Sequence, residues 1–285
     1  MLPKAVPRIT KVTAGIDWLS VTLPVESSDY QTWLGDCYWA LGQLGKEGYV
    51  IESRRLQGYE GIGFGNNFVG ESDKGAFAQI TGESANWFYP YTEHPKNHVS
   101  RIDAQITVQT DVMDINQGKR CLVASRNYNK ALAENKRRKI RILLGDGGAD
   151  TVYIGAVSSP QQLRIYNKEA QSEEPRYTKC WRYEAMLRNE AAVRLYRRLV
   201  AENYPATDYL LSFVVNYCRQ RGIIISGLEN IEPLPLEAIF QTPTDIERKL
   251  RWLREQVKPT LQKLSEAGYG DQAAEALGLW VPKQS

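Results

Sequence analysis

The sequence predicts an α+β protein: an antiparallel sheet with helices packed on one face, followed by a helical C-terminal part. Three stretches in which apolar and polar residues alternate indicate the sheet, namely residues 100–108, 161–168 and 180–187. Successive side chains of a strand point to opposite faces, so each stretch has one apolar and one polar face. Apolar residues at three- and four-residue intervals after residue 189 and after residue 244 indicate helices.

Further elements follow from local composition. We expect a loosely held arm over residues 1–13, a strand rich in β-branched and aromatic residues over 15–23, a hairpin over 59–67 and a strand over 75–81. Helical stretches are expected over residues 27–44, 114–135 and 207–219, and a short helix begins near residue 82. Because Ile16-Asp17 resembles Ile102-Asp103 and a helical stretch follows each strand, the sheet can consist of two related halves.

The domain organisation is expected to be one large domain over residues 14–230, which contains the sheet, and a helical module over 231–285. A proline-containing connection over residues 232–243 suggests the boundary, and Thr244-Asp-Ile-Glu247 has the form of a capping box. The apolar stripe of the helix that follows can pack on the rest of the chain or pair with a second copy.

Composition limits the function classes. The 285 residues are 42% hydrophobic and carry a net charge of +3, so the chain can bury a core, and any nucleic-acid surface must be a local patch. Its four scattered cysteines support neither a zinc site nor a disulfide framework. Without a signal-peptide pattern or an apolar run of membrane-spanning length, the expected location is the cytoplasm, away from membranes.

The candidate nucleophile is Tyr166. In an extended chain Arg164, Tyr166 and Lys168 share one face, which places a phenol between two cations. A phenol has a reference pKa near 10, and neighbouring cations should favour its phenolate and hold an anionic substrate, for which phosphate is the natural candidate.

Two carboxylates are expected beside this tyrosine. Asp103 shares a strand face with Arg101, and Glu184 shares one with Arg182. If the three strands are neighbours, their polar faces form one cluster, and paired carboxylates suit Mg²⁺ or Mn²⁺. The alternative is that these residues make cross-strand ion pairs and that Tyr166 is a packing residue.

Several motifs resemble the replication initiators of rolling-circle plasmids from Gram-positive bacteria, and also some relaxases of integrative elements and some phage replication proteins. They are Thr151-Val-Tyr-Ile-Gly155, Ser158-Ser159, Arg164-Ile-Tyr-Asn-Lys168, Trp181-Arg-Tyr-Glu184 and Ser100-Arg-Ile-Asp103. The resemblance implies that Tyr166 attacks a DNA phosphodiester, leaving a 5′-phosphotyrosine link and a free 3′-OH, and that Asp103 and Glu184 bind a divalent metal. Plasmid initiators often carry another acid where this chain has Thr107.

DNA is therefore the expected partner, at an origin or transfer site that is single-stranded or extruded as a hairpin. Residues 14–230 are the expected nicking and DNA-binding domain, in which Arg101 and Arg182 are expected to contact the strand. The cations Lys136, Arg137, Arg138, Lys139 and Arg141 can grip its backbone or form a solvated surface. A host helicase and a second copy of the chain are further partners to consider. The alternative function is sequence-specific DNA binding without chemistry, in which the arginines clamp the backbone.

Overall fold

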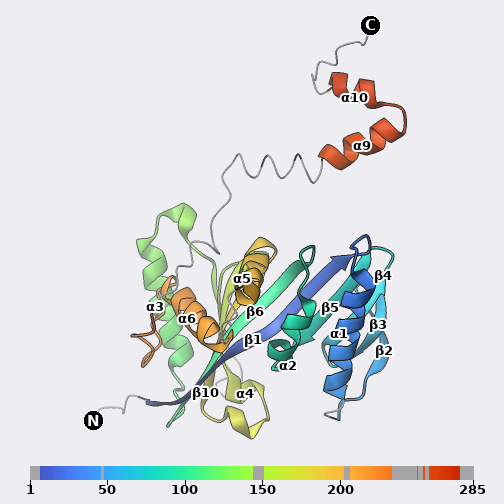
Figure 1. Cartoon of the computed structure of the whole chain (residues 1–285). Helices are drawn as coiled ribbons and strands as arrows, with labels where there is room; N and C mark the ends of the chain where they lie inside the picture. The colour runs from blue at the N-terminus through green and yellow to red at the C-terminus, as the bar shows by residue number, and fades with distance from the viewer. Residues whose placement is uncertain are drawn as a thin grey trace, which may run out of the picture. The chain divides into compact units, whose positions relative to one another are not determined.

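The structure is a computed structural model that describes residues 7–45, 48–143, 151–201, 206–232 and 257–276, together with residues 249 and 253 (Figure 1). The chain divides into two compact units, Met1–Ile239 and Phe240–Ser285. The predicted capping box at residues 244–247 lies outside the described residues.

The first unit contains a ten-stranded antiparallel sheet in the order β2-β3-β4-β5-β1-β6-β10-β9-β8-β7. The strands are β1 (Ile9–Pro24), β2 (Glu52–Leu56), β3 (Tyr59–Phe64), β4 (Asn67–Ser72), β5 (Gly75–Thr81), β6 (His98–Thr110), β7 (Ile140–Leu143), β8 (Thr151–Ile154), β9 (Gln161–Asn167) and β10 (Cys180–Arg188). Beside them lie α1 (Tyr30–Gly45), α2 (Ser84–Phe88), α3 (Gln117–Ala131), α4 (Lys168–Gln171), α5 (Glu190–Ala201) and α6 (Ala206–Arg219).

The sheet is built from two halves with the same connectivity. In the first half, β1 leads into α1 and then into four strands, of which the last, β5, returns to pair with β1. In the second half, β6 leads into α3 and then into four strands, of which the last, β10, returns to pair with β6. The two halves meet where β1 pairs antiparallel with β6. The two related halves considered from the sequence are therefore present in the fold.

Alternation along the strands separates the two faces of the sheet. Leu19 of β1 pairs with Ile102 of β6, which in turn pairs with Leu187 of β10, and all three are buried. Helices α5 and α6 pack on this apolar face over β1, β6 and β10, and α1 packs over β4 and β5 (Figure 1). The predicted α+β class, with helices on one face and polar residues on the other, is confirmed.

Some boundaries differ from the sequence prediction. Strand β1 begins at Ile9, so residues 9–13 belong to the sheet and not to a loose arm, because they pair with the end of β6. Helix α3 ends at Ala131, four residues earlier than expected, since Leu132 is already extended.

The second unit contains α9 (Lys258–Glu266) and α10 (Gly270–Ala276). Among the residues described in either unit, no helix is long and apolar enough to cross a membrane.

Candidate active site

The polar face of the sheet is organised in rows that cross several strands. Strand pairing aligns one row from the β7 edge to the centre: Arg141, Tyr153, Arg164, Glu184 and Gln105. The neighbouring row contains Thr151, Tyr166, Arg182 and Thr107. Paired residues of an antiparallel sheet point to the same face, so Tyr166, Glu184 and the three arginines lie side by side.

Tyr166 and Glu184 contact each other directly. The Tyr166 hydroxyl donates a hydrogen bond of 2.5 Å to Oε1 of Glu184, while a guanidinium nitrogen of Arg164 lies 3.3 Å from Oε2. The Arg164 guanidinium carbon also lies 4.1 Å from the centre of the Tyr166 ring. Both carboxylate oxygens of Glu184 are thus held by residues of β9, and the Tyr166 ring is held by Arg164 of the same strand.

Arg182 is buried beside the tyrosine and joins three strands. Its Nε donates to the Thr107 hydroxyl at 2.9 Å, and one terminal nitrogen donates to Oδ1 of Asp17 at 2.7 Å. Asp17 lies at an irregularity in the pairing of β1 with β6, where Ile16 and Trp18 pair but the residue between them does not. Because only 4% of Arg182 is exposed, it positions its neighbours and has little surface with which to contact DNA directly.

Asp103 is buried one strand further away. Arg101 binds both of its carboxylate oxygens, at 3.0 and 2.5 Å, and the Arg101 guanidinium carbon lies 4.1 Å from the centre of the Trp18 ring. The side chain of Arg101 remains 25% exposed. In this arrangement Asp103 is held by Arg101 and does not contact Tyr166 through any described hydrogen bond.

A segment after β9, residues 168–179, covers the tyrosine end of the polar face. Tyr177 of this segment is nearly buried, with the Lys168 ammonium 4.7 Å and the Arg182 guanidinium carbon 5.3 Å from its ring centre. Arg176 attaches the segment to the other half of the sheet through a 2.7 Å ion pair with Glu83. As a result Tyr166 is only 2% exposed.

Lys168 does not continue the strand as expected. Strand β9 ends at Asn167, whose side chain accepts a hydrogen bond from the backbone of Ala170 and begins the short helix α4. Lys168 still lines a cavity of about 140 Å³ together with Asp17, Arg182 and Tyr177. Burial, and next the charge of Arg182, lower the pKa of its ammonium group.

The expectation that neighbouring cations favour the Tyr166 phenolate is wrong for this structure. Burial raises the pKa of the phenol well above its usual value of 10, and the negative charge of Glu184 raises it further, whereas Arg182 opposes the rise. The phenol is therefore protonated at neutral pH and donates to the carboxylate.

The carboxylates also have perturbed proton affinities. Burial, followed by the charge of Asp17, raises the pKa of Glu184 from 4.5 to about 7, although Arg164 and the Tyr166 hydrogen bond oppose the rise. Burial raises the pKa of Asp103 as well, against the stabilising effect of Arg101. Asp103 and Asp17 both act electrostatically on Glu184, so three acids converge on this part of the sheet.

The carboxylates of this site are chemically suited to a hard cation, but they do not form a preformed metal-binding cluster. Within the described ranges, no group of three or more His, Cys, Asp or Glu side chains is placed to hold a metal ion. Carboxylate oxygens are the ligands that Mg²⁺ and Mn²⁺ prefer, and the mutual repulsion of the acids is what a cation would relieve. Asp103 and Glu184 could take it up by exchanging their arginine partners for the ion.

The basic segment predicted to grip DNA lies at the β7 edge of the same sheet. Lys136, Arg137, Lys139 and Arg141 are exposed, and Arg138 is half-buried. The Arg141 guanidinium carbon lies 4.6 Å from the Tyr153 ring centre, in the row that leads to Arg164 and Glu184. The exposed cations thus lie at the β7 edge of the sheet, where the polar row that leads toward Tyr166 starts.

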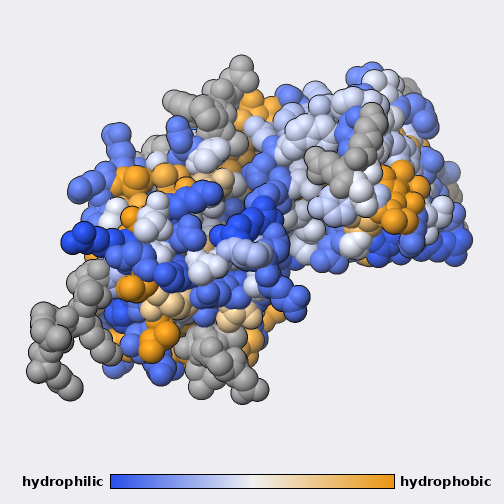
Figure 2. Space-filling model, turned by 90° about the horizontal axis from the view of Figure 1, so that it is seen from below, coloured by the Kyte–Doolittle hydropathy of each residue, from blue (hydrophilic) through white to orange (hydrophobic). Residues whose placement is uncertain are grey.

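The surface on the side where α4 lies is mainly hydrophilic. Seen from below, blue side chains cover much of the middle of this face, and the orange hydrophobic areas are small and separate (Figure 2). Such a surface suits a polar or charged partner better than an apolar one.

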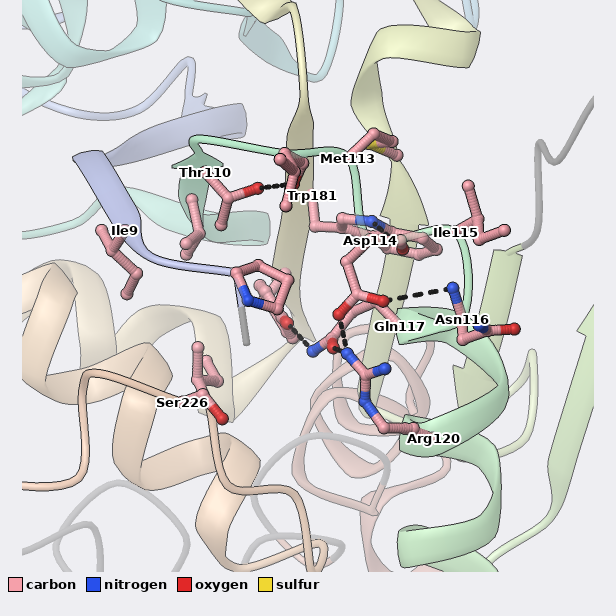
Figure 3. A pocket seen from close by; sticks show the side chains of 15 residues that line it. Ile9, Thr110, Met113, Asp114, Ile115, Asn116, Gln117, Arg120, Trp181 and Ser226 are labelled. Carbon is pink, nitrogen blue, oxygen red and sulfur yellow. Dashed lines mark hydrogen bonds and ion pairs between the residues drawn. The ribbon is translucent and has the colours of Figure 1, made fainter. Parts of the chain in front are cut away.

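Another cavity, of about 600 Å³, lies away from the tyrosine, where the end of β6 and the start of β10 meet the start of α3 (Figure 3). Asp114, Gln117 and Arg120 line it, and Arg120 pairs with Asp114 while Gln117 accepts from Arg120 at 2.6 Å. Trp181 closes one side and donates its ring nitrogen to the Asp114 carbonyl. None of the predicted site residues lines this cavity.

Sequence reasoning missed the covering role of Tyr177 and the bridge from Arg176 to Glu83. No strand pattern marks residues 168–179, and their partners are distant in the sequence. Gln171 was also missed; it donates to Thr151 at 3.2 Å and accepts from Arg164 at 3.0 Å. The motif Arg164-Ile-Tyr-Asn-Lys168 was the only signal near it.

Comparison with known proteins identifies relatives of this architecture. The sequence model of the replication initiation factor family matches residues 97–277. Among solved structures, a rolling-circle replication initiator protein from Geobacillus stearothermophilus is similar, with 18% sequence identity and a TM-score of 0.52, over 79% of this chain and 92% of that chain. At that identity the similarity concerns the fold. No curated protein sequence matches this chain.

Proposed function

Because this chain belongs to the replication initiation factor family, we propose that it initiates rolling-circle replication by nicking one DNA strand, with Tyr166 as the nucleophile. The observation that supports this assignment best is the 2.5 Å hydrogen bond from the Tyr166 hydroxyl to the buried carboxylate of Glu184. The bond supports the proposal because it gives the oxygen proposed to attack phosphorus a neighbouring proton acceptor.

In the proposed reaction the Tyr166 oxygen attacks a backbone phosphorus as its proton passes to Oε1 of Glu184. The bond from phosphorus to the 3′ oxygen breaks, and that oxygen takes up a proton from solvent. The products are a 5′-phosphotyrosine link and a free 3′-OH. A base whose pKa lies near 7 is well matched to proton transfer at neutral pH. Arg164, beside the ring, is placed to attract the phosphate.

We propose that Asp103 and Glu184 also hold Mg²⁺ or Mn²⁺, with Asp17 as the nearest further acid. When bound, such a cation would polarise the phosphate and stabilise the charge of the transition state. The two roles proposed for Glu184 use different oxygens, because Oε1 accepts from Tyr166 and Oε2 contacts Arg164.

The buried position of Tyr166 adds a conformational requirement. With 2% of the residue exposed, the phosphate reaches the hydroxyl only after residues 168–179 move away from the polar face. A host helicase that unwinds the duplex and a second copy of the chain are partners that this function would use.

The second candidate function is DNA binding without chemistry. It is favoured by the same burial and by the raised pKa of the phenol, which are ordinary for a structural tyrosine bonded to a carboxylate. The first experiment therefore measures covalent chemistry.

Tyr166→Phe should abolish nicking while leaving folding and DNA affinity nearly unchanged, since only the hydroxyl is removed. Supercoiled DNA carrying the element's own origin is incubated with Mg²⁺ or Mn²⁺, and protein–DNA adducts are separated under denaturing conditions. Tyr153→Phe is the matched control, because Tyr153 lies on the adjacent strand in the neighbouring row. Adducts that persist in Tyr166→Phe and vanish in Tyr153→Phe would transfer the role to Tyr153.

The metal proposal is tested by titration. Asp103→Ala and Glu184→Ala should raise the metal concentration needed for half-maximal nicking, whereas loss of the ion pairs with Arg101 and Arg164 alone would lower stability and leave that concentration unchanged. Glu60→Ala, which removes the exposed partner of Arg55, is the control. Unchanged metal dependence in both carboxylate variants would exclude the site, and Asp17 or Glu83 would be tested next.

A further inference from the structure

A third cavity, of about 740 Å³, lies next to the candidate site in the first half of the sheet. Three aromatic rings line it: Tyr49 from the connection between α1 and β2, Phe64 from the end of β3, and Trp87 from α2. We call this cavity the aromatic groove. Tyr49 and Phe64 are stacked, with ring centres 4.6 Å apart and planes 15° apart.

Two of these rings are exposed to solvent. Tyr49 is 51% exposed and Trp87 is 39% exposed, which is more than packing in a core would leave. Trp87 also contacts Tyr91, with ring centres 5.2 Å apart, and Trp39 at 6.4 Å, both in tilted arrangements. Exposed aromatic rings are the platforms on which unpaired bases stack.

The aromatic groove is continuous with the candidate active site. Gly82, Glu83 and Arg176 line both the groove and the smaller cavity that contains Asp17, Lys168 and Arg182. The backbone nitrogen of Gly82 donates to the carbonyl of Asp17 at 2.8 Å. Gly82 of the groove is therefore attached to β1, and the Asp17 carboxylate of β1 binds Arg182.

Cations accompany the rings along this path. Arg176 stands at the junction, and Arg54 donates to the carbonyl of Gly65, a groove residue, at 2.6 Å. A strand of nucleic acid needs both features, because its bases stack and its phosphates require positive charge. A duplex keeps its bases paired and inaccessible to the rings, so the composition favours a single strand.

Resting on the proposed nicking function, we infer that the aromatic groove binds unpaired nucleotides that flank the cut, stacking bases on Tyr49 and Trp87 and leading the strand past Arg176 to Tyr166. The groove therefore selects melted or single-stranded DNA for this site.

The test uses the full-length protein and a fluorescein-labelled oligothymidine of 20 nucleotides, with fluorescence anisotropy as the readout. Tyr49→Ala and Trp87→Ala should each weaken binding about tenfold, and Trp87→Phe should restore most of it, since stacking needs a ring. Tyr269→Ala is the matched control: Tyr269 is 57% exposed and does not line the groove. It should bind like the wild type.

Two further measurements distinguish the groove inference from the nicking proposal. The salt dependence of oligothymidine binding should be unchanged in Trp87→Ala, because stacking releases no counterions, but weaker in Arg176→Gln. Tyr166→Phe should bind the oligonucleotide normally.

If Trp87→Ala and Tyr49→Ala bind as tightly as Tyr269→Ala while the wild type nicks its origin, the groove inference is wrong and the nicking proposal stands. If both variants lose binding but no covalent adduct ever forms, the groove inference stands and the nicking proposal fails. The thermal unfolding of each variant is measured together with its binding. If Trp87→Phe loses as much affinity as Trp87→Ala and both variants keep the stability of the wild type, the stacking role of Trp87 is wrong.

Discussion

Replacing Glu184 by Gln should remove a large part of the pH dependence of stability between about pH 4.5 and pH 7. The carboxyl group has a pKa near 4.5 in the unfolded chain, and burial together with the charge of Asp17 raises the pKa to about 7 in the folded protein. The folded state therefore binds this proton more tightly than the unfolded state. Its contribution to stability is complete below about pH 4.5 and is lost as the pH rises to about 7.

The size of the effect follows from the two pKa values. One pKa unit corresponds to 1.36 kcal/mol, so the rise from 4.5 to about 7 corresponds to about 3 kcal/mol. A glutamine at this position still accepts the hydrogen bond of Tyr166 but cannot ionise. Relative to wild type, Glu184→Gln should gain about 3 kcal/mol between pH 4.5 and pH 8.

Urea denaturation of both proteins at pH values from 4.5 to 8 measures this difference, because the other titrating groups cancel between them. Glu60→Gln is the control: the Glu60 side chain is 66% exposed and pairs with Arg55 on the neighbouring strand, so its replacement should change the free energy of unfolding by less than about 1 kcal/mol at every pH. Parallel curves for wild type and Glu184→Gln would refute the raised pKa and, with it, the argument that Glu184 is suited to accept the tyrosine proton.

Two other predictions concern the turn that leads into β9 and the basic segment. Gly155 has φ of +117°, and a Cβ there would lie 2.7 Å from the carbonyl oxygen of Gln161, so Gly155→Ala should destabilise the protein by about 1–3 kcal/mol. Gly35→Ala, on the exposed face of α1 with open space around it, should instead stabilise by about 0.5–1 kcal/mol; similar effects of the two changes in urea denaturation would contradict the backbone argument. Replacing the four cations of Lys136–Lys139 by glutamine should reduce the slope of log affinity against log salt for duplex DNA by about 2–4. An unchanged slope would assign these cations to a solvated surface.

The polar face of the site was predictable because it depends on short-range pattern. Alternation places Asp103, Tyr166 and Glu184 each on the polar side of its strand, and pairing of β6 with β10 and of β10 with β9 then brings those sides together. Nothing in that reasoning requires knowledge of what lies above the sheet.

The state of Tyr166 was not predictable, because it depends on residues far away in the sequence. The cover over the phenol is attached through Arg176 to Glu83, which is 93 residues distant. An alternating pattern shows which way a side chain points but not how much solvent reaches it. The expected effect of the cations on the phenol was therefore outweighed by burial. The bond from Arg182 to Asp17 has the same origin, since it depends on an irregular pairing in a strand 165 residues away.

The construction of the sheet from two halves has a consequence for the order of folding. Each half closes on its own first strand through neighbouring hairpins, and the first half has its own buried layer under α1. Each half of the sheet is therefore suited to fold cooperatively, and the β1–β6 ladder is the boundary at which the two halves dock. Asp17 belongs to the first half, while Arg182 and Glu184 belong to the second. Hydrogen exchange should thus find the amides of β2–β5 and of β7–β10 opening as separate groups, and a chain in which only the first half has formed would lack Tyr166, Glu184 and Asp103 and hence the proposed nucleophile, base and metal ligand.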